Sequence, residues 1–267
     1  MSRISDASHS MAKLDELARK DTWLNRIHPL VKLLVTILYL VLTVSWKPRQ
    51  LTGVLGMALY PFLLFEIGGL SFKDALYRLR IVLPIVCLVG VFNPFFDREP
   101  VLTVFGITLT GGVLTMLSLM VKGVLTVLAS YLLIATTPVE SICGALSMIH
   151  LPGILVTEFL LICRYVSVLL DEADRMWQAY SLRAPGQKGV AMRAWGSMIG
   201  QLLLRSMDRA GALYQSMCLR GFRGEKPFFH GRSFRTTDLF YLAIWSAALI
   251  LLRVFPVLEL VGKIFVR

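Results

Sequence analysis

The sequence predicts an all-α integral membrane protein with about five transmembrane helices and further long amphipathic helices on the cytoplasmic side. Hydrophobic residues make up 56% of the 267 positions and the mean hydropathy is +0.67, which is more apolar than a soluble domain usually is. Several apolar runs reach about 20 residues, the length that crosses a hydrocarbon core of about 30 Å. A long charged stretch, residues 137–237, separates the last apolar run from the others.

The charge and the cysteine pattern narrow the function classes. A formal net charge of +11 fits a membrane protein whose Lys and Arg collect on cytoplasmic segments. A nucleic-acid-binding protein would also be basic, but it would not carry several spanning segments, so we expect no nucleic-acid partner. The four cysteines form no CxxC pair and the four histidines are scattered over different segments. We therefore expect no metal site, no cofactor and no disulfide framework.

The chain divides into four predicted sections. They are a cytoplasmic N-terminal segment (1–28), transmembrane helices 1–4 (29–136), a cytoplasmic helical region (137–237), and the last transmembrane helix with the C-terminus (238–267). No apolar segment with a small-residue cleavage site precedes the first span, so we expect no cleavable signal peptide. With the amino terminus inside, a charged loop at 71–80 and the 137–237 region both face the cytoplasm and hold most of the Lys and Arg.

Individual residues refine the predicted spans. The spans are 29–46, 51–70, 81–96, one that follows a turn at 111–112 and ends near 134, and 239–261. Lys32 lies near the start of the first span, where its side chain can extend to the interface. Pro61 and Glu66 interrupt the second span, which indicates a kink and contacts with neighbouring helices. Lys122 lies inside the fourth span and is expected to point into the bundle in a structural role.

Two long helices dominate residues 137–237. Thr136-Thr137-Pro138 has the pattern of a helix start, with a hydroxyl at the cap and proline at the first position. No strong helix breaker occurs between 154 and 182, so a helix of roughly 40 Å is expected there. Ala184-Pro185-Gly186 ends that helix, and a second long helix runs from about 190 to 219.

The two long helices end on similar short sequences. The first ends at Ser181-Leu182-Arg183-Ala184 and the second at Cys218-Leu219-Arg220-Gly221. When the two arginines are aligned, an aspartate and a glutamine upstream also coincide. We interpret this pattern as one kind of helix end that is used twice.

An arginine at a helix end has two explanations. It complements the negative end of the helix dipole, which is worth about a few tenths of a kcal/mol. Alternatively, its planar guanidinium binds carboxylates or carbonyls of a partner in a bidentate manner. The arginine occurs at both helix ends, each time beside small residues. This repetition favours docking into grooves on a partner that consists of two related subunits.

Short motifs along nearly the whole chain resemble one family of membrane proteins. The motifs are His28-Pro29-Leu30-Val31-Lys32-Leu33-Leu34, Phe92-Asn93-Pro94, Thr136-Thr137-Pro138, Leu151-Pro152, Arg164-Tyr165, Leu182-Arg183-Ala184 and Leu219-Arg220-Gly221-Phe222. In them the chain resembles the transmembrane T component of energy-coupling factor (ECF) transporters, in the CbiQ-type cobalt branch. Two departures are that the family often has Asp-Pro-Arg where this chain has His28-Pro29-Leu30, and often Arg-Gly where this chain has Ala184-Pro185.

The resemblance implies a non-catalytic coupling subunit of an ABC importer in the cell membrane. Its partners would be two ATPase subunits on the cytoplasmic face and a small substrate-binding membrane subunit, and we call residues 137–237 the coupling region. ATP hydrolysis would occur in the partners, whose closure would draw the arginine tips together and tilt the substrate subunit. The residues implied in ATPase coupling are Ser181, Leu182, Arg183, Ala184, Leu219, Arg220 and Gly221. The residues implied in contact with the substrate subunit are Leu155, Phe159, Leu169, Met198 and Leu202.

Other functions stay open at the level of sequence. Cobalt is the implied substrate, and a T subunit for nickel or for several vitamins is the alternative. A stand-alone carrier would show paired halves with polar groups meeting at mid-membrane, whereas the spans hold little beyond Glu66 and Lys122. A membrane enzyme would need converging acids, histidines or a metal site, and no phosphate-binding loop of the Walker type occurs.

Overall fold

The computed structural model describes the chain in two compact units. The described residues are 16–20, 22–47, 50–92, 100–104, 107–149, 152–186, 189–224 and 234–255. The larger unit comprises residues 18–137 and 232–267, and the smaller unit comprises residues 1–17 and 138–231.

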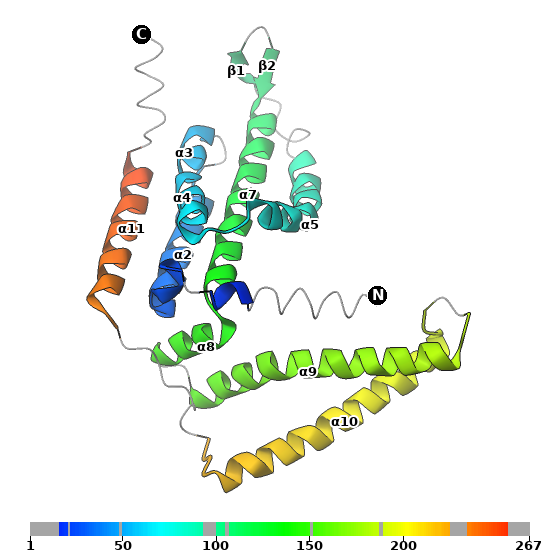
Figure 1. The fold of residues 1–267 in the computed structure, drawn as a ribbon. Coiled ribbons are helices and arrows are strands. Elements are labelled where there is room, and N and C mark those ends of the chain that lie inside the picture. Colours follow the sequence, from blue (N-terminus) through cyan, green and yellow to red (C-terminus); the bar gives the residue numbers. More distant parts are fainter. Residues whose placement is uncertain are drawn as a thin grey trace. The chain divides into compact units, whose positions relative to one another are not determined.

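Helix α7 (Gly111–Thr136) is the central element of the larger unit, where it packs against α2, α3, α4 and α5 (Figure 1). The other elements of this unit are the short 3₁₀ helix η1 (Leu24–Arg26), α2 (Pro29–Val44), α3 (Leu51–Gly56), α4 (Leu59–Gly68), α5 (Phe72–Val91), β1 (Pro100–Val104), β2 (Ile107–Thr110) and α11 (Thr236–Val254). Helix α11 packs against α2 and α3. The prediction of an all-α membrane protein is confirmed, with one short hairpin as the exception.

Helices occupy each of the five predicted spans in the described part of the chain, but only three of these spans coincide with a helix long and apolar enough to cross a membrane. Four helical segments in the described part of the chain are long and apolar enough to cross a membrane: Leu51–Gly68, which comprises α3 and α4, Gly111–Thr136, Gly153–Arg183 and Thr236–Val254. The third of these belongs to the predicted coupling region. Helix α2 is apolar but shorter, at 16 residues. The predicted last span begins earlier than expected, at Thr236, and its positions beyond Phe255 lie outside the described residues.

Residues 72–80 are helical, so the predicted loop at 71–80 was wrong. Helix α5 runs without interruption from Phe72 to Val91 and has Asp74 in its first turn, where a carboxylate complements the helix dipole. Its buried residues Ala75 and Leu79 are four positions apart and lie on one face. The charged residues were read as a loop signal, but charge alone does not break a helix, and residues 72–80 contain no glycine or proline.

A β-hairpin occupies residues where only a turn and a short lead-in were expected. Strands β1 and β2 pair antiparallel, with Thr103 opposite Thr108 and Val104 opposite Ile107. The residues are mostly β-branched, which favours extended backbone. The predicted acidic turn at 97–99 lies outside the described residues.

The predicted kink in the second span is a helix break just before Pro61. Helix α3 ends at Gly56 and α4 begins at Leu59. Proline cannot donate a hydrogen bond to the carbonyl four residues earlier, which belongs to Met57. The hydroxyl of Tyr39 on α2 donates to that carbonyl oxygen at 3.1 Å. Glu66, predicted to contact other helices, is instead exposed in the last turn of α4.

Aromatic side chains join α2, α4 and α11. The rings of Tyr39 and Tyr60 stack with centroids 4.5 Å apart, and Tyr60 meets the Trp245 ring edge to face at 4.9 Å. Such pairs contribute about 0.5–1.5 kcal/mol beyond their buried area. They hold the last helix of the chain against the first ones.

Two buried lysines donate to helix C-termini between α2 and α7. Lys32 Nζ donates to the Thr136 carbonyl oxygen at 2.7 Å, and Lys122 Nζ donates to the Val44 and Trp46 carbonyl oxygens at 3.1 and 2.5 Å. The inward structural role expected for Lys122 is confirmed. The expectation that Lys32 extends to the interface was wrong, because the last carbonyls of α7 have no partner within their own helix and accept its ammonium group.

The smaller unit consists of α8 (Val139–Met148), α9 (Gly153–Arg183) and α10 (Met192–Leu219). Helix α8 packs against α9, and α9 and α10 diverge from the turn that joins them (Figure 1). The predicted hydroxyl cap at the start of α8 was wrong: Pro138 is the N-cap, and its carbonyl accepts from the N–H groups of Ser141 and Ile142. The hydroxyl of Thr137 is buried and makes no hydrogen bond in the described structure.

Candidate functional site

The two predicted arginine sites lie at opposite ends of the α9–α10 helix pair. Arg183 is the last residue of α9, beside the turn that leads into α10, and Arg220 follows the last residue of α10. Helix α10 has 28 residues, so it separates the two sites by roughly 40 Å. Any partners that bind these arginines therefore bind at separate places.

Both arginine sites are exposed together with the leucines before them. The side chains of Arg183 and Arg220 are exposed, and Leu182 and Leu219 are 82% and 89% exposed. An isolated exposed leucine needs no explanation. An exposed leucine next to an exposed arginine at both tips is a pattern that suits a groove with an apolar floor and acidic or carbonyl groups at its rim.

The end of α10 is fixed by a glycine in the left-handed region. Gly221 has a φ of 84°, its N–H donates to the Cys218 carbonyl at 2.9 Å, and the Phe222 N–H donates to the Met217 carbonyl at 3.0 Å. This pair of bonds is the Schellman motif. The motif places Arg220 at the C-cap, where its side chain leaves the helix at a defined position.

The end of α9 is built differently, although the two sequences look alike. Ala184 is the C-cap with φ −124° and ψ 64°, and its N–H donates to the Tyr180 carbonyl at 3.0 Å. The first positive φ comes only at Gly186, because Pro185 intervenes. Arg183 is thus the last helical residue whereas Arg220 is a cap residue, and the two sites are offset by one position relative to their helix ends.

An ion pair fixes the point at which α9 and α10 approach each other. Arg205 of α10 binds the Glu172 carboxylate of α9, and Arg175 lies 4.0 Å from the other oxygen of that carboxylate. The Glu172 side chain is largely buried while both arginines are mostly exposed. Solvent screening keeps the contribution of such a pair to about 1 kcal/mol or less, so it sets the geometry of the pair more than its stability.

Reversing one charge of this pair is expected to let the helices separate. Glu172→Arg places a third cation between Arg175 and Arg205 and should broaden the distance distribution between spin labels at residues 167 and 207. Combining it with Arg205→Glu should restore a narrow distribution. The control Asp208→Arg changes charge equally on an exposed position of α10 outside the pair. An unchanged distribution in Glu172→Arg would contradict the assigned role.

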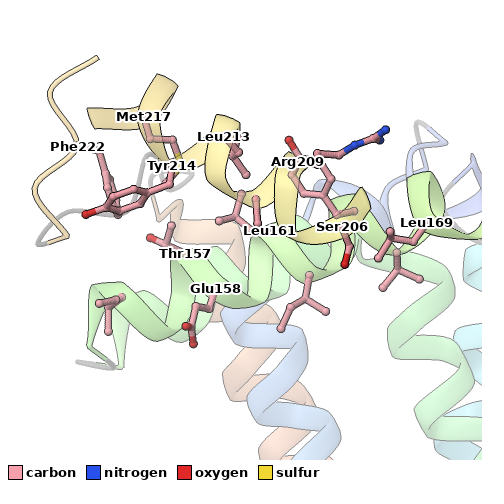
Figure 2. A pocket seen from close by; sticks show the side chains of 15 residues that line it. Thr157, Glu158, Leu161, Leu169, Ser206, Arg209, Leu213, Tyr214, Met217 and Phe222 are labelled. Atoms are coloured by element: carbon pink, nitrogen blue, oxygen red, sulfur yellow. The ribbon is translucent and has the colours of Figure 1, made fainter. Parts of the chain in front are cut away.

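A groove of about 580 Å³ opens between the first half of α9 and the second half of α10. Figure 2 shows side chains from both helices directed toward this space, among them Leu161 and Leu213. Glu158 and Arg209 carry charge at its lining, and the rest is mainly apolar. The Tyr214 hydroxyl also lies there, and its interaction with the Cys218 side chain raises the pKa of the tyrosine. The groove offers a long apolar surface with few polar groups.

The predicted contact residues do not share one surface. Leu169 lines the groove, whereas Leu155 and Phe159 are exposed elsewhere on α9, and Met198 and Leu202 on α10 are half-buried. The sequence prediction covered the apolar faces around 155–169 and 198–204 and did not single out the face that forms the groove. The groove residues recur at intervals of three and four positions along α9 and along α10, and this helical spacing is visible in the sequence. The groove residues not predicted are Ile154, Thr157, Glu158, Leu161, Ile162, Tyr165, Val166, Ser206, Arg209, Ala210, Leu213, Tyr214, Met217 and Phe222.

Comparison with known proteins places the chain in a family. The family model described as CbiQ, cobalt transport protein, matches residues 20–230. The chain belongs to the CbiQ family. It is a T component of an ECF transporter and a multi-pass protein of the cell membrane.

Two curated proteins are similar to this CbiQ-family chain. The energy-coupling factor transporter transmembrane protein EcfT of Leuconostoc gelidum subsp. gasicomitatum is 27% identical over 227 residues, covering 76% of this chain and 81% of that protein. The nickel permease LarQ of Lactiplantibacillus plantarum is 29% identical over 115 residues, covering 43% of this chain and 41% of LarQ.

Proposed function

We propose that this T component transmits ATP-driven motion of two ATPase subunits to a small substrate-binding membrane subunit. The observation that carries the proposal is the pair of exposed Leu-Arg helix ends at opposite ends of one helix pair. Two separate tips can each dock on one ATPase subunit. Movement of the two ATPase subunits relative to each other would then displace the helices between them.

The smaller unit has the stiffness that such transmission needs. Helix α9 has 31 residues and α10 has 28, and neither contains an internal proline. The Glu172–Arg205 pair joins them near the closed end of the groove. A displacement of Arg183 or Arg220 is therefore transmitted along a continuous hydrogen-bonded helix, with no flexible loop in which it could be absorbed.

Each residue at the tips has a proposed role. Arg183 and Arg220 bind the ATPase subunits, with Leu182 and Leu219 filling apolar space beside them. Ser181 and Ala184 keep the first tip small, and Gly221 ends the second helix in the left-handed conformation that its φ of 84° records. The chain itself would be non-catalytic, with ATP hydrolysis in the partners.

The groove and the exposed apolar residues around it are the proposed surface for the substrate-binding subunit. Leu169 would contribute from inside the groove, and Leu155, Phe159, Met198 and Leu202 from the adjoining faces of the two helices. Burial of this apolar area against a membrane subunit would supply the association energy.

Cobalt is the proposed substrate, on the description of the matching family as cobalt transport proteins. Nickel is the second candidate, because one similar protein is a nickel permease. Selectivity would reside in the substrate-binding subunit, and a T component shared among vitamin importers is the remaining alternative.

Reconstituted vesicles test the proposal. Vesicles that contain the chain, the ATPase subunits and the substrate-binding subunit should take up radiolabelled cobalt when ATP is supplied, and uptake should vanish when any one subunit or ATP is omitted. Uptake by the chain alone would instead indicate a stand-alone carrier. Faster uptake of nickel or of a vitamin by the complete complex would reassign the substrate and leave the coupling role intact.

A further inference from the structure

The coupling region is joined to the larger unit at two points, and both points are bound to the first turns of α2. The chain leaves this unit after Thr137 and re-enters it at residue 232. At the exit, the Thr136 carbonyl accepts from Lys32 Nζ at 2.7 Å. At the re-entry, the Asp238 carboxylate accepts from the His28 N–H at 2.9 Å. His28 and Lys32 are one helical turn apart.

Asp238 ties together the starts of two helices. One carboxylate oxygen accepts from the His28 N–H at the start of α2, and the other accepts from the Arg235 N–H at the start of α11, both at 2.9 Å. The His28 ring also stacks on Phe234, with centroids 4.1 Å apart. A single negative charge thus lies at the positive ends of two helix dipoles.

These groups are shielded from solvent. His28 and Asp238 are each 2% exposed, and Lys32 is 4% exposed. Charged groups buried to this degree are costly unless they are hydrogen-bonded, and Lys32 and Asp238 are both bound to backbone groups. Hydrogen bonds of ionised groups are roughly twice as strong as neutral ones. The start of α2, the end of α7 and the start of α11 are therefore held firmly to one another.

We propose that the first turns of α2, with Asp238, form the fulcrum of the coupling region. His28, Lys32 and Asp238 act as positioning residues, because they hold both connections of the region at one place on one helix. A lever passes on displacement only if its attachment does not yield. If the two connections moved independently, displacement of α9 and α10 would change the distance between the connections and would not move the rest of the complex. This inference rests on the proposed coupling function.

The chain offers a matched control at the other end of α2. Lys122 is also a buried lysine of the α2–α7 contact, and it donates to the Val44 and Trp46 carbonyls at 3.1 and 2.5 Å. Its chemistry equals that of Lys32, but it lies at the end of α2 far from both connections. Any role that depends only on stability should affect the two lysines alike.

The test compares Lys32→Met, Asp238→Asn and Lys122→Met in the complete complex, with three readouts: yield of the co-purified complex, ATP hydrolysis, and cobalt uptake. Lys32→Met and Asp238→Asn are expected to keep ATPase binding and hydrolysis while uptake per ATP falls roughly 10- to 100-fold, the range that corresponds to one lost charge-assisted hydrogen bond. Lys122→Met should keep the normal ratio of uptake to hydrolysis, even if its yield falls. Lys32→Arg, which keeps the cation, should recover much of the lost ratio.

A normal ratio of uptake to hydrolysis in both Lys32→Met and Asp238→Asn would contradict the proposal that the first turns of α2 form the fulcrum. An equal fall of that ratio in Lys122→Met would also contradict the proposal, because the loss of coupling would then reflect a general loss of structure. If Lys32→Met does not accumulate, Asp238→Asn and Lys32→Arg decide the matter by the same ratio. The proposed function fails separately, when replacement of both tip arginines leaves ATPase binding and uptake unchanged.

Discussion

Replacing Arg183 and Arg220 together by alanine is expected to abolish ATPase association and substrate uptake while leaving membrane insertion intact. Both side chains are exposed at helix ends in the free chain, so their removal costs the fold little. In the complex each would leave a partner carboxylate or carbonyl without its charged donor, and each loss is expected to weaken binding roughly 100-fold. Co-purification with the ATPase subunits and uptake by the assembled complex measure the result.

Single and conservative variants sharpen this experiment. Arg193→Ala removes an exposed arginine from the first turn of α10, away from both tips, and should behave as the unmodified chain. Lysine at position 183 or 220 keeps the charge but not the planar fork, so recovery should be partial. Wild-type yield of the complex together with normal uptake in the double variant would rule out the docking role.

Ser167→Pro is expected to uncouple uptake from ATP hydrolysis while ATPase binding persists. Ser167 is exposed in the middle of α9. Proline there removes one helix hydrogen bond and clashes with the carbonyl four residues earlier, at a local cost of about 3 kcal/mol. The resulting kink separates most of the groove lining on α9, which ends at Leu169, from the Arg183 tip and leaves both tips chemically unchanged. ATP hydrolysis and uptake, measured on the same preparation, should therefore diverge.

The matched control for the kink is Ser167→Ala. The serine hydroxyl donates to the Arg164 carbonyl at 3.0 Å, and alanine removes only this exposed bond while favouring helix. Ser167→Ala should couple normally. If Ser167→Pro also transports at the normal rate per ATP, stiffness of α9 is not required for transmission.

The sequence predicted what depends on local pattern. Hydropathy located the apolar helices, and the prolines and glycines located most helix ends, including Pro185 and Gly221. It did not predict that residues 72–80 continue α5, because charge was weighed above the absence of a helix breaker. It did not predict the hairpin either, since two strands of this length give a weak signal.

The hydrogen bonds between residues far apart in the chain could not be predicted from sequence patterns. Lys32 and Thr136 are 104 positions apart, and His28 and Asp238 are 210 apart. No spacing rule relates such residues, and only the packing of α7 and α11 against α2 brings them together. The groove face is an intermediate case, because helical spacing within α9 and α10 marks it once the two helices are known to face each other.

Helix α9 has the length and composition of a span, and almost none of its apolar half is buried within the chain. If α9 lies on the cytoplasmic side, as proposed, it is a segment that must be kept out of the bilayer during synthesis. The charged residues from Asp171 to Arg175 oppose its entry, because their transfer into lipid is costly. In a chain made without the other subunits of the transporter, this apolar surface would stay exposed. We therefore expect the chain to be most stable when the subunits are synthesised at the same time.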